Sequence, residues 1–473
     1  MSRPVNTRST RRRAERPERV VATVGIIGMF VLSAGYFATS HVARSVRPLS
    51  DNTVGVQQKT AVLSARRTPT NLSTISRIGT VSRALAVFAP QIPSQSCGRV
   101  DWLGHTILNV NGPQTVTPAS ATKVVTAAAA LSVLGPKYTY TTTIKAASAP
   151  VGGVVDNLYF VGGGDPLLSR TEYTATEKYP TLTPTSLASL ADKIAASGIR
   201  QVTGSIVVDD SRYDDVRFVD AWPTDFHFTE AGPLGALMVD DGVVLGENMK
   251  PADPALAAAA ELHALLSQRG IFVSGPNLRA PIPSGALDIA QIVSAPMTDV
   301  LKEMLTNSDN NTAELVLKEI GLVAKKSGST AAGLQAVQDL LAKWGLSNSV
   351  VMNDGSGLSA ANKISCNVFA QLLIREKSVL PQLLAVAGVS GTIRDAFDNS
   401  PVKGRLVGKT GTLNGVKALA GYLPLETERP VVFSLLLNKS GIDNQSAYRP
   451  IWNALADALH KAKATPQSDQ LAP

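Results

Sequence analysis

Three short motifs occur in one order along this 473-residue chain and must meet in space if they act together. They are Ser120-Ala121-Thr122-Lys123, Ser308-Asp309-Asn310 and Lys409-Thr410-Gly411-Thr412. About 190 residues separate the first two motifs. A domain that unites the motifs is therefore discontinuous in sequence, and the segment between Ser120 and Ser308 is expected to contain an inserted domain whose two ends lie close together.

The first motif has the spacing of a nucleophile and its base. A serine hydroxyl needs a base within hydrogen-bond reach, and residues three apart share one face of a helix. Thr117-Pro118 precedes the motif, residues 124–133 are almost all apolar, and Gly135-Pro136 follows. This pattern predicts a buried helix with Ser120 at its N-terminus, where the helix dipole favours negative charge, and with Lys123 at a lowered pKa.

A second Ser-x-x-Lys sequence, Ser400-Pro401-Val402-Lys403, does not fit this chemistry. A chain of this length contains about one or two such matches by chance, so the pattern alone is weak. Pro401 disfavours a helical conformation at Ser400, and Gly404 follows directly. The sequence predicts a turn here, in which Ser400 and Lys403 are not stacked.

The second motif interrupts a predicted helical stretch, residues 297–318. Apolar residues at helical spacing lie on both sides of it, but residues 306–312 are all polar. Ser, Asp and Asn are also typical of a solvated loop or a helix cap, and in isolation this alternative stays open. Beside the other motifs, Ser308 is interpreted as a proton relay next to Lys123, and Asn310 as a donor to a substrate amide.

The third motif lies on the first strand of a predicted antiparallel meander. Asn414-Gly415 is a strong hairpin signal, and two apolar runs follow it, residues 418–423 and 431–437. Gly411 suits the close approach of another backbone or a ligand. In isolation, however, the simpler interpretation is an exposed lysine before a turn.

The side chains of this motif suit a carboxylate. Lys409 offers a charge, and Thr410 and Thr412 offer hydroxyl donors. The backbone N–H of Thr412 is also placed to pair with that of Ser120 as an oxyanion hole.

With these motifs, the chain resembles the DacB-type D-alanyl-D-alanine carboxypeptidases/endopeptidases, which are low-molecular-mass class C penicillin-binding proteins. The resemblance runs from about residue 60 to about residue 462. Four further segments contribute to it, residues 62–67, 163–166, 354–359 and 388–392.

The resemblance implies a multi-domain α+β fold. Its catalytic domain would be of the penicillin-binding-protein/β-lactamase type, an antiparallel sheet with flanking helices, and would carry an inserted α+β domain. It implies a cell-wall serine peptidase that removes the terminal D-Ala from peptidoglycan stem peptides, with cleavage of cross-links as a further option. Ser120 would be acylated by the peptide or by a β-lactam, Lys123 would be the base, and Ser308 and Asn310 the second catalytic element. Lys409, Thr410, Gly411 and Thr412 would bind the terminal carboxylate.

Two other functions remain open at this point. One is a β-lactamase or related serine esterase with the same motifs, which rapid turnover of a β-lactam would reveal. The other is a non-catalytic peptidoglycan-binding scaffold, which would bind without releasing product. No cofactor or metal is expected, because the five histidines show no ligand spacing.

The spacing of the motifs gives a domain layout. We expect the catalytic domain at residues 60–145 and 293–462, ending in a helix from residue 445. We expect the inserted domain at 146–292, with strands near 154–161, 201–208 and 271–274 and helices near 187–196 and 256–266. The glycine run at 162–164 is interpreted as a turn at a strand end, because the Lys-Ser/Thr of a phosphate-binding loop is missing.

The N-terminus predicts a membrane anchor. Residues 1–19 form a basic tail, and the first 20 residues hold seven Arg and two Glu, which is +5 of the net charge of +8. The apolar stretch 20–40 is long enough to span a bilayer, and the positive residues before it place the rest of the chain outside the cytoplasm. A cleaved signal peptide is the alternative. The predicted location is the cell membrane, single-pass, with residues 41–59 as a tether.

The basic excess therefore lies mainly in the tail. No nucleic-acid partner is expected, because no base-reading motif or stacking platform is visible. Residues 463–473 are expected to be disordered.

The chain has two cysteines, Cys97 and Cys366, and both fall in the predicted catalytic domain. A disulfide suits an exported protein. Two separate buried thiols are the alternative, because the sequence does not show that the residues are close.

Overall fold

The computed structural model describes residues 29, 31–36, 69–176, 178–425 and 429–463. Contacts divide the chain into two units, Met1–Arg67 and Thr68–Pro473. In the first unit, residues 29 and 31–36 are helical. Within the described residues, no helix is both long enough and apolar enough to cross a membrane.

Most of the predicted anchor at residues 20–40 lies outside the described residues. The predicted basic tail at 1–19 and the predicted tether at 41–59 lie wholly outside them. So does the predicted C-terminal tail, except for Lys463.

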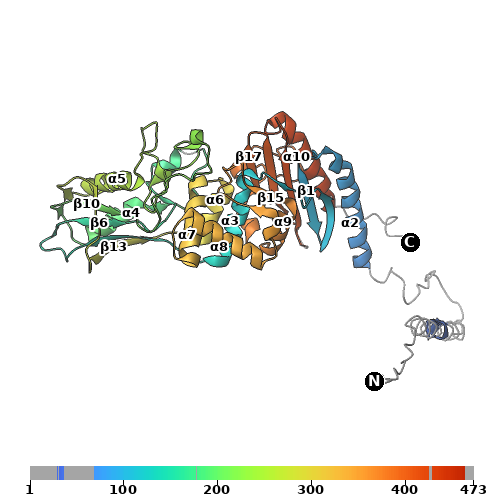
Figure 1. Cartoon of the computed structure of the whole chain (residues 1–473), viewed down its shortest axis with the longest axis horizontal. Coiled ribbons are helices and arrows are strands. Elements are labelled where there is room, and N and C mark those ends of the chain that lie inside the picture. The colour runs from blue at the N-terminus through green and yellow to red at the C-terminus, as the bar shows by residue number, and fades with distance from the viewer. Residues whose placement is uncertain (1–28, 30, 37–68, 177, 426–428, 464–473) are drawn as a thin grey trace, which may run out of the picture. The chain divides into compact units, whose positions relative to one another are not determined.

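The second unit is built around an antiparallel six-stranded sheet with the order β16-β17-β18-β19-β1-β2. Figure 1 labels two of its strands, β17 and β1. The hairpin predicted at Asn414-Gly415 joins β17 to β18, with Leu413 opposite Val416. The strand bounds are β16 Ala385–Val386, β17 Val407–Leu413, β18 Val416–Leu423, β19 Val431–Asn438, β1 Cys97–Trp102 and β2 His105–Val110.

The residues of β18 alternate between two hydrophobic cores, because successive side chains of a strand point to opposite faces. Ala418, Ala420 and Tyr422 belong to one core, and Leu419 and Leu423 to the other. Both faces of the sheet are therefore buried.

Helices cover the two faces. On the face of Leu419 lie α2 (Pro69–Phe88) and α10 (Gln445–His460), which is the closing helix expected from residue 445. The opposite core holds five helices: α3 (Lys123–Val133), α6 (Met297–Thr306), α7 (Asn310–Lys325), α8 (Thr330–Lys343) and α9 (Cys366–Arg375).

A disulfide joins Cys97, the first residue of β1, to Cys366, the first residue of α9. Both residues are fully buried, and their Cα atoms are 5.8 Å apart. The bond closes a loop across 269 positions of the chain and fixes α9 to the central sheet.

The inserted segment forms its own five-stranded sheet, with the order β12-β10-β6-β4-β13. The contacts of β10 with β6 and β12 are parallel, and those of β4 with β6 and β13 are antiparallel. The bounds are β12 Leu278–Arg279, β10 Ile206–Asp209, β6 Leu158–Val161, β4 Thr141–Ala146 and β13 Leu287–Val293.

Two helices pack into the core of this sheet, α4 (Leu187–Ala196) and α5 (Pro254–Gln268). Their N-termini are capped by side chains, Ser186 for α4 and Asp253 for α5. Such caps satisfy backbone N–H groups that have no partner inside the helix. The glycine run at 162–164 directly follows β6, at the strand end where the sequence predicts a turn.

Shorter strands complete the fold. Three form a parallel sheet beside α5, three link the segment before Ser120 to the segment before α9, and two form a parallel pair. Their bounds are β5 Val154–Val155, β9 Gln201–Val202 and β11 Phe272–Val273; β3 Thr115–Val116, β14 Val350–Val351 and β15 Lys363–Ser365; β7 Leu168–Ser169 and β8 Thr185–Ser186.

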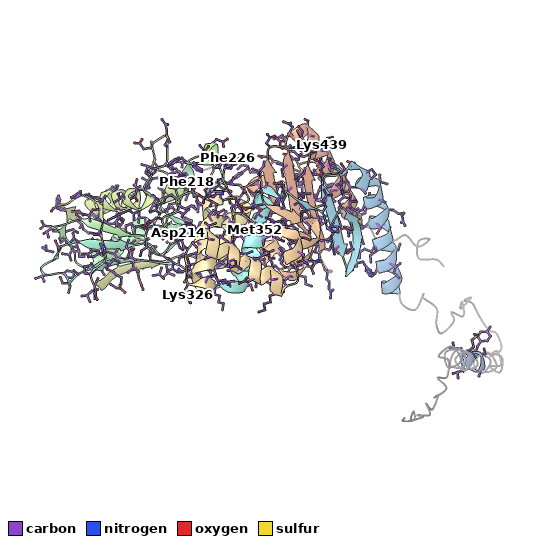
Figure 2. All side chains as sticks on the ribbon, in the orientation of Figure 1. Asp214, Phe218, Phe226, Lys326, Met352 and Lys439 are labelled. Carbon is purple, nitrogen blue, oxygen red and sulfur yellow. A yellow bond between two sulfur atoms is a disulfide. The ribbon has the colours of Figure 1, made fainter. Side chains whose placement is uncertain are left out.

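Helix α7 connects the inserted segment to the catalytic region. Lys318 of α7 is buried and pairs with Asp214, which Figure 2 labels. The neighbouring Glu319 accepts hydrogen bonds from Arg212 and from the hydroxyl of Tyr213. In both ion pairs the partner on α7 is buried, so these contacts fix the relative position of the two elements, because breaking one leaves an uncompensated buried charge.

The predicted α+β fold is confirmed, with an antiparallel sheet flanked by helices and a second, inserted sheet. The inserted sheet begins with β4 at Thr141 and ends with β13 at Val293, where the sequence suggested residues 146–292. The limits of the separate domains stay predictions.

Candidate active site

Ser120 lies in a short 3-10 turn, η3 (Ala119–Thr122), which leads directly into α3. The first eight residues of α3, from Lys123 to Ala130, are all buried, as the apolar pattern predicts. Ala119 has a φ of 49°, in the left-handed region that residues other than glycine rarely adopt. Backbone strain of this kind is concentrated at functional sites, where the surrounding packing holds it in place.

Lys123 joins three separate segments of the chain. Its Nζ lies 3.2 Å from Ser120 Oγ, 2.6 Å from Asn310 Oδ1 and 2.7 Å from the backbone oxygen of Ser356. The whole residue has no solvent exposure. One side chain therefore links the first motif, the second motif and the loop at residues 354–359.

The partners of Lys123 determine where its lone pair points when the amine is neutral. The backbone oxygen of Ser356 can only accept a hydrogen bond. The amide nitrogen of Asn310 donates to the backbone oxygen of Glu230 at 2.9 Å, so the amide oxygen faces Lys123 and accepts from it. Both N–H groups of a neutral amine are then used, and the lone pair is left for the hydroxyl of Ser120.

Burial lowers the pKa of Lys123 from 10.5 to about 8, against the opposing effect of Asp354, Asp309 and Glu314. Burial disfavours the charged form of a lysine because it removes water from the ammonium group. A substantial fraction of this amine is therefore neutral near physiological pH.

The second motif forms the junction between α6 and α7. Ser308 has a φ of 68° in this junction, Asp309 caps α7 through the N–H of Thr312, and Asn310 is the first residue of α7. The helix-cap interpretation is thus correct for Asp309. Ser308 and Asn310 nevertheless both face the site, because Asn310 contacts Lys123 and Ser308 contacts Lys409.

Lys409 lies deeper than the sequence suggests. It has no solvent exposure, and its Nζ donates to Ser308 Oγ and to the backbone oxygen of Thr410, both at 2.8 Å. Burial, with further effects from Lys123 and Lys417, lowers the pKa of Lys409 well below its usual value. Lys409 is therefore placed to act through Ser308, and its expected role as a direct ligand of a carboxylate would require it to reach past that residue.

Two glycines allow the strand and the loop to reach the Ser120 turn. A Cβ on Gly411 of β17 would lie 2.4 Å from the backbone oxygen of Pro118. A Cβ on Gly357 would lie 2.0 Å from the backbone oxygen of Ala119, and Gly357 also has a φ of +87°. Glycine is needed at both positions because any side chain would push the neighbouring backbone away from Ser120.

Residues of all three motifs line one cavity of about 340 Å³. Ser120 and Ser308 lie on its wall with Thr410 and Thr412 of β17. Lys123, Asn310, Lys409 and Gly411 lie behind this wall and are not part of the lining. The structure thus brings the eight residues of the predicted site together, with the hydroxyl groups facing the cavity and the two amines behind them.

Ser400 and Lys403 lie in a turn outside this cavity, as predicted. Lys403 pairs with Asp398 at 3.0 Å.

Sequence reasoning missed Glu314, which supports Lys123 through the loop at residues 354–359. Glu314 is fully buried, and its Oε1 accepts the N–H groups of Gly355 at 2.9 Å and Ser356 at 2.7 Å. Burial, reinforced by Asp354, raises its pKa to about 7. Glu314 follows Asn310 by four positions on α7, and this helical spacing is the one sequence signal that could have found it.

The chain matches the sequence profile of the D-Ala-D-Ala carboxypeptidase 3 (S13) family over residues 83–252 and 245–460. It is 29% identical over 421 residues to a D-alanyl-D-alanine carboxypeptidase of Actinomadura sp. (strain R39), covering 71% of this chain and 76% of the relative. It is 30% identical over 346 residues to carboxypeptidase DacB of Mycolicibacterium smegmatis, covering 70% and 73%.

Among solved structures, the fold is similar to penicillin-binding protein 4 (dacB) of Haemophilus influenzae. The TM-score is 0.66 at 22% identity, covering 80% of this chain and 99% of that one. The same protein has been solved in complex with a β-lactam.

Replacement of Glu314 tests its support of the Lys123 loop. We expect Glu314→Leu to lower the free energy of unfolding by about 2 to 4 kcal/mol, because two buried N–H groups lose their acceptor. Glu314→Gln keeps an acceptor oxygen at the same place and should cost less than about 1 kcal/mol. Denaturant unfolding of the two variants and the wild type measures the difference. Equal losses in both variants would show that the carboxylate does not act as this acceptor.

Proposed function

We propose a reaction for this chain from the premise that it belongs to the D-Ala-D-Ala carboxypeptidase 3 (S13) family, whose members are serine peptidases. The substrate is a peptidoglycan stem peptide that ends in D-Ala-D-Ala, and the products are free D-Ala and the shortened peptide. β-Lactams acylate the same serine as substrate mimics.

The observation that carries the proposal is the set of contacts around Lys123. An amine of pKa about 8 lies 3.2 Å from Ser120 Oγ, and its two other contacts are both hydrogen-bond acceptors. A general base must lie within hydrogen-bond reach of the proton it takes, at a pKa near the working pH. Lys123 meets both conditions, which supports Ser120 as the nucleophile.

In the first step, Ser120 Oγ attacks the carbonyl carbon of the penultimate D-Ala and its proton passes to Lys123 Nζ. The backbone N–H groups of Ser120 and Thr412 bind the oxyanion that forms. The C–N bond then breaks, and the leaving nitrogen takes the proton back from Lys123 by way of Ser308. The contact between Lys409 and Ser308 supports this relay, because it fixes the orientation of the Ser308 hydroxyl.

In the second step, water attacks the ester carbonyl of the acyl-enzyme. The C–O bond to Ser120 breaks, and the proton that the water gives up returns to Ser120 Oγ, which releases the shortened peptide as a free acid. Asn310 keeps Lys123 in place in both steps, because its amide oxygen accepts a hydrogen bond from Lys123 Nζ.

Cleavage of peptide cross-links is a second candidate activity. It is supported by the volume of the cavity, about 340 Å³, and by a lining that extends beyond the three motifs to Tyr179, Thr392 and Gln445. A single D-Ala leaving group does not need this space, whereas a longer leaving peptide does.

Replacement of Ser120 tests the proposed function. We expect Ser120→Ala to abolish covalent labelling by a fluorescent penicillin and to abolish D-Ala release, because no acyl-enzyme can form. The purified full chain is incubated with the label, with a D-Ala-D-Ala peptide and with a cross-linked dimer, and the products are separated by mass. Ser400→Ala is the matched control and should label like the wild type. Labelling of Ser120→Ala at the wild-type rate would refute the assignment.

The pKa of Lys123 predicts a pH dependence of acylation. Only the neutral amine accepts the Ser120 proton, so the first-order acylation rate at saturating penicillin should rise about tenfold per pH unit below pH 8 and level off above it. Glu314→Gln removes a negative charge that raises this pKa, so its profile should shift to lower pH. A rate that does not change between pH 6 and pH 8 would exclude Lys123 as the base.

We also propose that residues 20–40 anchor the chain in the cell membrane, with the catalytic region outside the cytoplasm. The basic tail before an apolar stretch of this length supports the proposal. We expect the full chain to sediment with membranes and to be released by detergent but not by high salt. Recovery of the mature chain in the soluble fraction, without these residues, would show a cleaved signal peptide instead.

A further inference from the structure

Residues of β18 and α10 form one wall of the cavity that holds Ser120. Lys417 of β18 lies on this wall with Tyr448, Arg449 and Trp452 of α10. On the neighbouring strand β17, Thr412 lies directly opposite Lys417 in the strand register. Lys417 thus adjoins the threonine to which the carboxylate of the substrate is assigned.

The groups in direct contact with Lys417 are neutral, although the charge of Asp443 also acts on it and opposes the lowering of its pKa. Its Nζ donates to Thr412 Oγ1 at 2.9 Å and lies over the rings of Tyr448 and Trp452, 4.2 Å and 5.3 Å from their centroids. No carboxylate within the described residues forms an ion pair with it. Aromatic faces orient a cation but do not neutralise its charge.

Arg449 adds a second cation at the same wall. Its Nε is buried and has no hydrogen-bond partner within the described part of the chain. A buried donor without a partner is costly, so a ligand with acceptor oxygens is the natural complement. Arg449 is also one of the groups that lower the pKa of Lys417, to about 8, after the larger effect of burial.

The hydroxyl of Thr412 is oriented by this contact. An ammonium group has only hydrogens to donate, so Thr412 Oγ1 is the acceptor. The hydrogen of Thr412 therefore remains available to a ligand in the cavity. Lys417 thus offers its own charge and also orients a second donor.

The motif lysine does not supply this charge. Lys409 is fully buried, donates to Ser308 and Thr410, and is not part of the cavity lining. Lys417, by contrast, lines the cavity beside Thr412.

We propose that Lys417, assisted by Arg449, binds the terminal carboxylate of the substrate together with Thr412 and so determines the preference for peptides with a free carboxyl end. This inference rests on the proposed function and adds residues outside the three motifs to its substrate site. The ligand class is a peptide or β-lactam with a carboxylate next to the bond that is attacked. Lys417 is both a specificity residue and a positioning residue for the Thr412 hydroxyl.

The test compares ligands that differ only in this carboxylate. Acylation of the full chain is measured with benzylpenicillin and with its methyl ester, and D-Ala-D-Ala peptides are compared as the free acid and the terminal amide. We expect Lys417→Met to lose about 10- to 100-fold in kcat/KM on the acids, mainly through KM, and to change little on the ester and the amide. Lys417→Arg should restore most of the loss, because it keeps the charge.

Two further variants complete the test. Lys439→Met removes a charge from an exposed lysine, which Figure 2 labels, just after β19 and should behave like the wild type on every ligand. Arg449→Met should also lose kcat/KM on the acids and not on the ester or the amide, with a smaller loss than Lys417→Met. If Lys417→Met does not fold, Arg449→Met serves as the test.

The outcomes separate the two proposals. Equal losses on the acids and on the ester or amide would show that Lys417 only supports the packing of α10, and would overturn the inference while Ser120 labelling stands. Wild-type behaviour of Lys417→Met on the acids would do the same. Failure of the wild type to react with any of the ligands would overturn the proposed function, and this inference with it.

Discussion

The site depends on one buried amine. Lys123 is fully enclosed, yet it contacts Ser120, Asn310 and the backbone of Ser356, which come from three distant parts of the chain. A buried amine with poor partners would destabilise the fold, so these acceptors must stay in place. The packing of α3 against α7 and the loop around Ser356 therefore serves stability and catalysis through the same hydrogen bonds.

Local relations within the chain made much of this predictable. Ser120 and Lys123 are three positions apart at the start of a helix, and the apolar run after them shows that the helix is buried. Asn414-Gly415 determines the hairpin that presents the third motif. In each case the physical cause lies within a few residues, so it can be read without knowledge of the tertiary structure.

Other parts of the site depend on contacts that no short pattern contains. Ser356 contributes a backbone oxygen, which every residue has, and Arg449 reaches the cavity only because α10 packs beside β18. The burial of Lys409 could not be predicted either, because the motif gives the residue type but not its solvent exposure. The sequence assigned Lys409 to the carboxylate from its charge and from the family resemblance, whereas in the structure Lys409 is fully buried and Lys417 lines the cavity beside Thr412.

The three lysines of the site differ in burial, and their proposed roles differ accordingly. Lys123 and Lys409 are fully buried and face hydroxyls, whereas Lys417 keeps partial contact with the cavity. Burial lowers the pKa of each, and the mutual repulsion of Lys409 with Lys123 and Lys417 lowers the pKa of Lys409 further. Neutrality suits a base that takes a proton, but it would weaken a group that binds a carboxylate. Lys417 has about the same lowered pKa as Lys123, so its suitability for the anionic end of a substrate rests on its position in the cavity lining beside Thr412 and on the aromatic rings that favour a cation.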